Sequence, residues 1–268
     1  MLTNMTTPFG TFAISQSNTQ NKTGILFFSG LGINSAYYDF YNVVTSLKKT
    51  NINLITIDLL DAGFSSSALV ENRSLEQITT EILYVVTHLD LDKVIFCCHS
   101  YSAIYLLNLI ENTDISSNVD ILGFIGIDPT SASTMIHYMS DFEAMLDKLN
   151  GGYSISDSDI NPNLSSKLFT QCKNLYLKHT NNRNLINEIS QASTTITKMK
   201  NYKLDEAIPS LSILSTLNSQ DYQKYGNPCN NSNPLSKQII LKSHHYIHWQ
   251  QLDKVCSLIK KFISDIYY

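Results

Sequence analysis

A serine between a predicted strand and a predicted helix is the residue of this chain best placed to act as a nucleophile. Ser100 follows the apolar run Val94–Cys98 and precedes a helical pattern of apolar residues. A sharp strand-turn-helix at this point would hold the serine in a strained backbone conformation, and the residues two before and two after it must be small. Cys98 and Ser102 are small, although neither is glycine. The other interpretation of Ser100 is a helix N-cap, a position that serine favours.

A serine hydroxyl reacts only when a base takes its proton and an acid orients that base, so the partners must come from elsewhere in the chain. A histidine-rich segment, His244-His245-Tyr-Ile-His248, directly follows a predicted strand near the C-terminus. Its three histidines are also a candidate metal cluster, but the sequence has neither an HExxH motif nor a plausible set of Cys or Asp companions. The segment therefore favours a general base, and we predict no metal site.

The elements that must position these residues alternate between strand and helix patterns over the first 130 residues. Runs of β-branched and aromatic residues predict strands at 10–14, 24–28, 53–57, 94–98 and 121–127. Helical periodicity lies between them, and such alternation builds parallel sheets through right-handed crossovers. We therefore predict an α/β fold with a mostly parallel twisted sheet flanked by helices.

The residue composition of the chain changes after residue 130. Residues 131–205 are rich in Asn, Ser, Thr and Lys, with apolar residues at helical spacing, and strand signals return at 211–215 and 238–241. We predict that residues 1–130 and 206–268 form the core and that residues 131–205 form an inserted helical cap, or lid. The alternative is a plain peripheral helical layer with no role in substrate choice.

The composition excludes several classes of protein. Hydrophobic residues make up 43% of the 268 residues and charged residues 16%, so the chain is able to bury a core. A formal charge of -4 without a long basic run argues against nucleic acid or an anionic membrane as the main partner. A small-molecule substrate is the expected partner.

The sequence also carries signals about location. No window approaches the roughly 18 uninterrupted apolar residues of a membrane helix, and the start of the chain lacks a basic region followed by an apolar one. Five cysteines without a C-x-x-C pair indicate a reducing compartment. We therefore expect a cytoplasmic protein without a membrane span.

Four motifs in this order resemble those of the α/β-hydrolase fold family, and the resemblance extends over most of the chain. Phe28-Ser-Gly-Leu-Gly32 resembles the HGxG oxyanion loop, with Ser29 in place of histidine. Asp58-Leu-Leu-Asp-Ala-Gly-Phe-Ser65 is similar to the D-x-x-G-x-G-x-S turn, with Asp61 where the first glycine commonly stands.

The other two motifs carry the candidate nucleophile and base. Cys98-His-Ser-Tyr-Ser102 resembles the nucleophile elbow of the family, G-x-S-x-G. His245-Tyr-Ile-His-Trp-Gln250 resembles the stretch that begins with the catalytic histidine. The resemblance implies that His245 is the base and that His244 and His248 are packed or solvent-facing neighbours.

Two aspartates are candidates for the acid, and both keep the chain order Ser, acid, His. Asp128 ends the strand before the insertion, where some lipases and dehalogenases of this fold place their acid. Asp221 follows the next strand, where most of the family keeps it, but it lies several residues beyond the predicted strand end. We therefore favour Asp128 and keep Asp221 as the alternative.

The resemblance also implies the donors that would stabilise a developing oxyanion. They are backbone N–H groups of the residue after the nucleophile and of the early loop, which correspond to Tyr101 and Leu31. Gly30 and Gly32 would let this loop approach closely. The other interpretation of the two glycines is a simple tight turn.

These inferences together predict a serine hydrolase that cleaves a small ester, thioester or amide through an acyl-enzyme, without a metal or organic cofactor. The alternative is a non-catalytic ligand-binding protein on the same scaffold. A dehalogenase-like or epoxide-hydrolase-like activity normally needs an aspartate where this chain has Ser100, and we set it aside. The patterns assign neither the acyl preference nor the oligomeric state.

Overall fold

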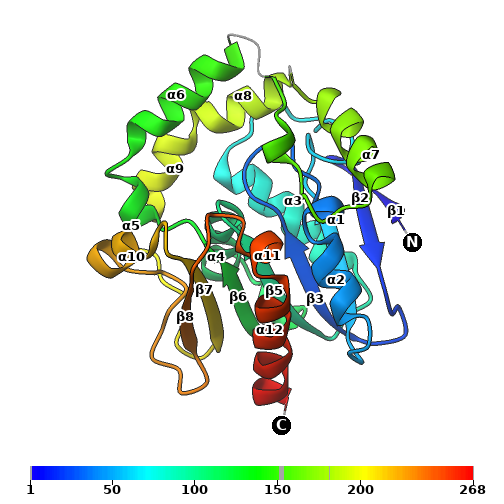
Figure 1. Ribbon diagram of the computed structural model, residues 1–268, viewed down its shortest axis with the longest axis vertical. Helices are drawn as coiled ribbons and strands as arrows, with labels where there is room; N and C mark the ends of the chain where they lie inside the picture. Colours follow the sequence, from blue (N-terminus) through cyan, green and yellow to red (C-terminus); the bar gives the residue numbers. More distant parts are fainter. Residues whose placement is uncertain (1, 151–153, 181, 268) are drawn as a thin grey trace.

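The computed structural model describes residues 2–150, 154–180 and 182–267, and within them eight strands form one sheet (Figure 1). The strand order is β1-β2-β4-β3-β5-β6-β7-β8. The strands are β1 (Leu2–Thr7), β2 (Gly10–Gln16), β3 (Thr23–Phe28), β4 (Asn53–Asp58), β5 (Lys93–His99), β6 (Asp120–Ile127), β7 (Ser210–Ser215) and β8 (Lys237–Leu241). β1 with β2 and β2 with β4 are antiparallel, and the remaining pairs are parallel. The predicted α/β class with a mostly parallel sheet is confirmed.

Seven of these strands coincide with the predicted ones to within two residues at each end, because buried parallel strands are marked by continuous apolar runs. β1 was not predicted. Its residues are mostly polar and half-exposed or exposed, so neither an apolar run nor a clean alternation marks it. It forms because a short connection returns the chain beside β2, with Thr7 opposite Gly10.

Helices cover both faces of the sheet. On one face, α3 (Leu75–His88) and α4 (Ser102–Asn112) pack against Phe28, Phe96 and Cys98 in one apolar cluster. On the other face, α1 (Ala36–Asp39), α2 (Tyr41–Leu47) and α12 (Leu252–Tyr267) pack against a second cluster that includes Cys97. Since successive side chains of a strand point to opposite faces, the adjacent cysteines enter different cores. Both are fully buried, as expected for small apolar core residues.

The chain between β6 and β7 is helical. Its elements are α5 (Ala132–Met135), α6 (Met139–Asn150), η2 (Asp157–Asp159), α7 (Ser166–Leu177), α8 (Arg183–Ser190) and α9 (Ala192–Met199). Helices α6, α8 and α9 pack against one another and lie at the opposite end of the molecule from the end of α12 (Figure 1). A third apolar cluster joins this segment to the core, because Leu149, Cys172 and Leu185 pack with Ile33 and Tyr38.

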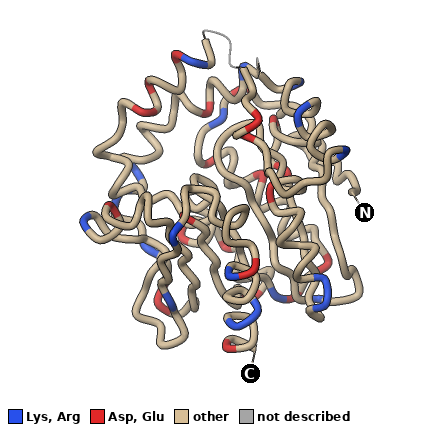
Figure 2. Tube along the Cα trace, viewed as in Figure 1, with Lys and Arg blue, Asp and Glu red and all other residues tan. Residues whose placement is uncertain are grey.

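The remaining helices are short: η1 (Ile115–Ser117) precedes β6, α10 (Ser219–Tyr225) follows β7, and α11 (Ile247–Gln250) precedes α12. None of the helices in the described part of the chain is long and apolar enough to cross a membrane. Figure 2 shows Lys and Arg dispersed along the trace rather than gathered in one stretch, in line with the small net charge. All five cysteines lie among the described residues, where each is buried and free of disulfides.

Candidate active site

The turn that carries Ser100 is fixed by the carboxyl ends of neighbouring strands. The Ser100 N–H donates to the carbonyl of Ile127 at 3.2 Å, and the Ser100 carbonyl accepts from the N–H of Thr130 at 2.9 Å. The Ser102 hydroxyl donates to the carbonyl oxygens of Phe28 at 3.1 Å and His99 at 2.9 Å. These bonds join the ends of β3, β5 and β6, so the hydroxyl of Ser100 is presented at the edge of the sheet.

Ser100 is not the cap of the following helix. The N-cap of α4 is Tyr101, and no side-chain hydrogen bond caps that end of the helix. The backbone of Ser100 has a φ of 57°, in the left-handed region. Such a conformation costs free energy in a residue with a side chain and persists where the surroundings impose it. The N-cap interpretation of Ser100 therefore does not hold.

Two other non-glycine residues of the described chain have a positive φ: Asp61 at 71° and Asp128 at 44°. Both belong to motifs that the sequence singled out. At Asp61 the left-handed backbone explains why relatives of this fold commonly have glycine there, since Asp is one of the few side chains that tolerates it. At Asp128 the backbone turns sharply after β6 and brings the ring of Pro129 against Gly126. A Cβ on Gly126 would lie 2.8 Å from Cγ of Pro129, so the absence of a side chain at this position leaves space for the ring.

The carboxylate of Asp128 is buried and bound to His245. The His245 Nδ1–H donates to Asp128 Oδ2 at 2.8 Å, although the two residues are 117 positions apart. The same oxygen accepts from the Ser215 hydroxyl at 2.9 Å and from Asn218 Nδ2 at 2.7 Å, while Oδ1 accepts from the Ser215 N–H at 2.9 Å. With the proton held on Nδ1 by this bond, Nε2 is the basic nitrogen of the His245 ring.

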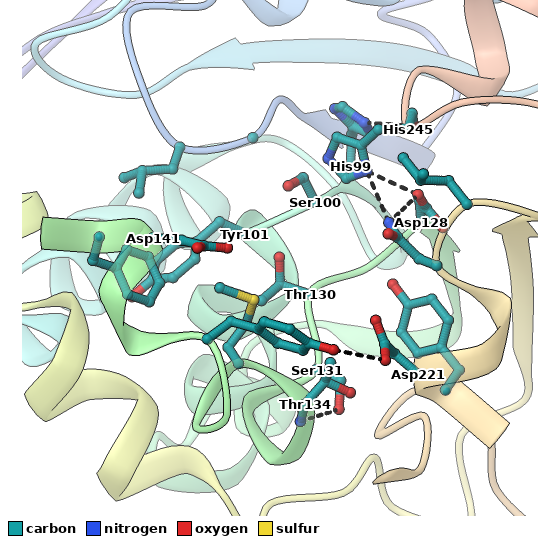
Figure 3. Close-up of a pocket in the computed structure, with 18 of the residues that line it drawn as sticks. His99, Ser100, Tyr101, Asp128, Thr130, Ser131, Thr134, Asp141, Asp221 and His245 are labelled. Carbon is teal, nitrogen blue, oxygen red and sulfur yellow. Dashed lines mark hydrogen bonds and ion pairs between the residues drawn. The ribbon is translucent and has the colours of Figure 1, made fainter. Parts of the chain in front are cut away.

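The structure places Asp221, the alternative acid, elsewhere. Its Oδ1 accepts a hydrogen bond from the Tyr138 hydroxyl at 3.0 Å. Asp221 lies on α10, one turn after Asn218. Asn218, which lies closer to the end of β7 than Asp221 does, donates to the carboxylate of Asp128. Ser100, His245 and Asp128 lie close together at one side of the cavity in Figure 3, with Asp221 apart from them.

The loop after β3 lies against the Ser100 turn. A Cβ on Gly30 would be 3.0 Å from Ser100 Cβ and 3.5 Å from Ser100 Oγ, so a side chain at this position would crowd the turn and force a small shift of the loop or of Ser100. Among the described residues, the backbone N–H groups of Leu31 and Tyr101 donate no backbone hydrogen bond, and both residues line the cavity in front of Ser100. These two groups are therefore free to donate to a ligand oxygen.

A buried polar cluster lies behind His245. The His99 Nε2–H donates to the backbone carbonyl of His245 at 3.2 Å, and the two rings are 4.6 Å apart. Burial lowers the pKa of His99 well below its usual value, so this imidazole is neutral. His248 Nε2 and Trp249 Nε1 donate to Asp39 Oδ1 at 2.7 and 3.0 Å. The cluster holds the main chain on which His245 is carried.

Asp39, His99 and His248 also offer ligand atoms within 4.8 Å of one another, which raises the question of a metal site. Two ligands of a tetrahedral zinc with bonds of 2.0–2.1 Å lie about 3.3 Å apart. The contact between His248 Nε2 and Asp39 Oδ1 is 2.7 Å, which is the length of a charge-assisted hydrogen bond. The donor set therefore fits a hydrogen-bonded network better than a metal site.

The sequence predicted that His248 is a packed or solvent-facing neighbour of the base, and it assigned no role to Asp39 or His99. The structure buries His248 with 1% of its surface exposed, as the packed interpretation predicted. His99 stands in the variable position of the nucleophile elbow, so its type was visible in the motif, but no pattern linked it to residue 245. Asp39 lies in a four-residue helix without any motif.

In front of Ser100 lies a cavity of about 510 Å³. Its walls combine the candidate catalytic groups with side chains from the segment between β6 and β7, including Met135, Phe142 and Met145. Gly30, Leu31, Tyr101, His245 and Tyr246 also border it. The arrangement places the Ser100 hydroxyl, the His245 imidazole and two backbone N–H groups around a space large enough for a small organic molecule.

Comparison with known proteins gives matches by structure only. No protein-family model matches the sequence, and neither does any curated protein. The structure of Smu.1393c from the cariogenic pathogen Streptococcus mutans has 21% identity and a TM-score of 0.72, with 98% of this chain and 99% of that chain covered.

Two further solved structures are similar over the whole chain. MenH from S. aureus has 17% identity and a TM-score of 0.71, with 98% of this chain and 100% of that chain covered. A mutant of an epoxide hydrolase from Vigna radiata has 13% identity and a TM-score of 0.74, with 98% of each chain covered. At these identities the likeness concerns the backbone, and together with the sheet order and the turn at Ser100 it shows that this chain has the α/β-hydrolase fold.

Proposed function

We propose that this protein is a serine hydrolase that cleaves a small ester, thioester or amide through an acyl-enzyme. The observation that carries the proposal is the 2.8 Å hydrogen bond between His245 Nδ1 and the buried carboxylate of Asp128, beside a serine with a left-handed backbone. Their combination supports nucleophilic catalysis, because a serine becomes reactive when a neighbouring base is oriented by an acid, and a strained serine backbone is typical of a nucleophile elbow.

In the proposed reaction, Ser100 Oγ attacks the carbonyl carbon of the substrate while His245 Nε2 takes the hydroxyl proton. Asp128 stays ionised, keeps the His245 ring in the required tautomer and stabilises the imidazolium that forms. The N–H groups of Leu31 and Tyr101 donate to the carbonyl oxygen as its negative charge develops. His245 then gives its proton to the leaving oxygen, sulfur or nitrogen.

The second half of the reaction repeats these steps with water. His245 takes a proton from water, the resulting hydroxide attacks the acyl-enzyme, and the proton returns to Ser100 Oγ as the carboxylic acid leaves. No step of this catalytic cycle requires a metal or an organic cofactor. We also propose that residues 131–205 act as a cap over the core, since their side chains Met135, Phe142 and Met145 form part of the cavity in front of Ser100.

Epoxide hydrolase chemistry, which the name of one structural neighbour specifies, is not proposed for this chain. That chemistry normally uses an aspartate as the nucleophile at the elbow, and this chain has Ser100. The neighbour therefore supports the scaffold of the proposal and not its reaction.

The proposal is tested by labelling with a fluorophosphonate probe and by hydrolysis of a panel of p-nitrophenyl esters graded by chain length. We expect the probe to modify Ser100 and a Ser100→Ala variant to lose turnover by a factor on the order of a million in kcat. Thermal unfolding and circular dichroism of Ser100→Ala, compared with the wild-type protein, control for loss of the fold. Unchanged hydrolysis by Ser100→Ala would refute the assignment, and the absence of labelling in the folded protein would favour the non-catalytic binding protein.

A further inference from the structure

The cavity in front of Ser100 carries negative charge that the proposed reaction does not use. Apart from Asp128, the acidic residues among the described residues that line it are Asp141 and Asp221. No Lys or Arg belongs to the described residues that line it. A substrate with a carboxylate or phosphate would therefore enter a space that has two carboxylates and no cationic side chain to pair with it.

Asp221 is held in place at the cavity. The hydrogen bond from the Tyr138 hydroxyl to its Oδ1 links α10 to the turn between α5 and α6, and it is drawn as a dashed line in Figure 3. Asp221 raises the pKa of the Tyr138 phenol through this bond, so the phenol stays a donor at neutral pH. Among the described residues, Oδ2 of Asp221 receives no hydrogen bond, and it is the oxygen left for a ligand.

The nearest cation on the same helix, Lys224, interacts electrostatically with Asp221 and Tyr138 but is not among the described residues that line the cavity. Lys224 Nζ lies 4.7 Å from the centre of the Tyr225 ring, and neither residue lines the cavity. Asp141 lies on α6, which comes from the segment between β6 and β7, and it occupies a different part of the pocket from Asp221 (Figure 3). The two carboxylates thus act on the cavity from separate elements.

Aromatic side chains supply the second part of a site for a cation. Five aromatic residues line the cavity: Tyr101, Tyr138, Phe142, Tyr222 and Tyr246. The faces of such rings attract ammonium groups, and this attraction is stronger where water is partly excluded. Carboxylates combined with aromatic rings form the surroundings that favour an alkylated ammonium over a neutral group of the same shape.

We propose that the substrate of this cavity carries an ammonium group remote from the scissile bond, and that Asp221 and Asp141, with the aromatic walls, select it. This inference rests on the proposed function for the position of the scissile bond. It assigns to Asp221 a role in specificity in place of the role of catalytic acid that the sequence left open.

The test uses three thioesters of butyric acid that differ only in the thiol. One is the thiocholine ester, which is cationic, one is its neutral isostere with 3,3-dimethylbutanethiol, and one is the anionic ester of 3-mercaptopropanoate. We expect kcat/KM to fall by about tenfold from the cationic to the neutral ester and by at least another tenfold to the anionic ester. Equal values for the cationic and neutral esters, or preference for the anionic one, would overturn the proposal.

Amide variants separate charge from shape. Asp221→Asn keeps a side chain that accepts the hydrogen bond from Tyr138 but removes the charge. Asp141→Asn removes a carboxylate of the same type on α6. We expect each substitution to lower the preference for the cationic over the neutral ester by threefold to tenfold, mainly through a higher KM. Asp147→Asn changes the same formal charge on α6 outside the cavity and should leave the preference unchanged. The same change of preference in all three variants would show that only the net charge of the protein matters.

Equilibrium binding keeps this inference distinct from the hydrolase proposal. Calorimetric titration of Ser100→Ala with the three thioesters measures the charge preference without any turnover. The expected order of affinity is cationic, neutral, anionic. If this order holds while the wild-type protein cleaves none of the esters, the hydrolase proposal fails and the cation-selective cavity stands. If the neutral ester is cleaved by a Ser100-dependent reaction but the order is absent, the cavity inference alone is wrong.

Discussion

At the scale of single residues, the site depends on backbone conformations that most side chains avoid. Ser100 and Asp128 both have a positive φ, and each is held there by hydrogen bonds to neighbouring strands. Local strain of this kind concentrates at functional sites because the surrounding structure must maintain it. The two residues follow adjacent parallel strands, so the strained turns lie side by side at the same edge of the sheet.

Replacement of Asp128 by Asn tests the acid. Asn retains an acceptor for the Ser215 N–H, but its amide would face His245 Nδ1 and favour the tautomer with the proton on Nε2. We expect kcat to fall by about 10⁴-fold with little change in KM, as for loss of the acid from a serine protease triad. Steady-state kinetics on a neutral ester measure the effect. Asp221→Asn should retain kcat within about tenfold, and a larger loss there than in Asp128→Asn would reverse the assignment.

Replacement of Gly30 by Ala tests the approach of the oxyanion loop. The new Cβ would lie 3.0 Å from Ser100 Cβ, so the loop must move away from the nucleophile and carry the Leu31 N–H with it. We expect a loss of about tenfold in kcat, because even a shift of a few tenths of an ångström misaligns the Leu31 N–H with the developing oxyanion. Gly24→Ala is the matched control: its Cβ would lie 2.9 Å from Leu91 Cδ1, far along the sheet from the site. It should reduce thermal stability without a comparable loss in kcat.

At the scale of elements, the segment between β6 and β7 is tied to the core by buried polar contacts as well as by apolar packing. Asn182 and Asn184 donate to Asp61 Oδ1 at 3.3 and 2.9 Å. The carboxylate of Glu188 on α8 accepts a hydrogen bond from the Tyr105 hydroxyl on α4. Loss of these hydrogen-bond partners would lower the stability of the folded state, because a carboxylate shielded from water without a partner is energetically unfavourable.

The contact of Glu188 predicts a pH dependence of stability. Burial raises the pKa of Glu188 to about 7, from 4.5, so between these values the folded state binds a proton that the unfolded state has released. The contribution of Glu188 to the free energy of unfolding is therefore greatest at low pH and falls as the pH rises towards 7. The glutamine of Glu188→Gln does not titrate. We therefore expect the Tm of this variant to decline between pH 5 and 8 by about 2–4 °C less than the Tm of the wild type, a difference that corresponds to ~1 kcal/mol in a domain of this size. Parallel curves for variant and wild type in thermal unfolding would contradict the raised pKa.

At the scale of the whole molecule, both faces of the sheet are covered, and the thiols are enclosed within the resulting cores. All five cysteines are buried and free, and burial raises the pKa of Cys97, Cys98 and Cys229. A thiol in this state is protonated and inaccessible, so it reacts only after the structure opens.

Thiol labelling measures this enclosure. We expect less than one equivalent of an aromatic disulfide reagent to react with the native protein on the time scale of an enzyme assay, and all five thiols to react in denaturant. The rate under native conditions should increase with denaturant concentration in step with the loss of structure. Rapid reaction of one or more thiols in the native protein would show that a cysteine is more accessible than the structure indicates.

The amino-acid sequence determined most of the scaffold and singled out Ser100 as the candidate nucleophile. Continuous apolar runs predicted seven strands because strands covered on both faces must be apolar throughout, and the small residues around Ser100 marked the sharp turn. Strand β1 escaped prediction because an edge strand is stabilised by pairing with its neighbour, and its own side chains remain largely polar.

The tertiary structure decided which groups meet. Asp128 and Asp221 both follow strands in the order that the fold allows, and the sequence alone did not distinguish them. Their surroundings do: the carboxylate of Asp128 contacts His245, and that of Asp221 contacts Tyr138. Likewise, Asp39 joins His248 across 209 positions without any motif. Local patterns report the backbone conformation and burial of a segment, whereas contacts between distant side chains depend on how the elements pack, and that is fixed only when the whole sheet has formed.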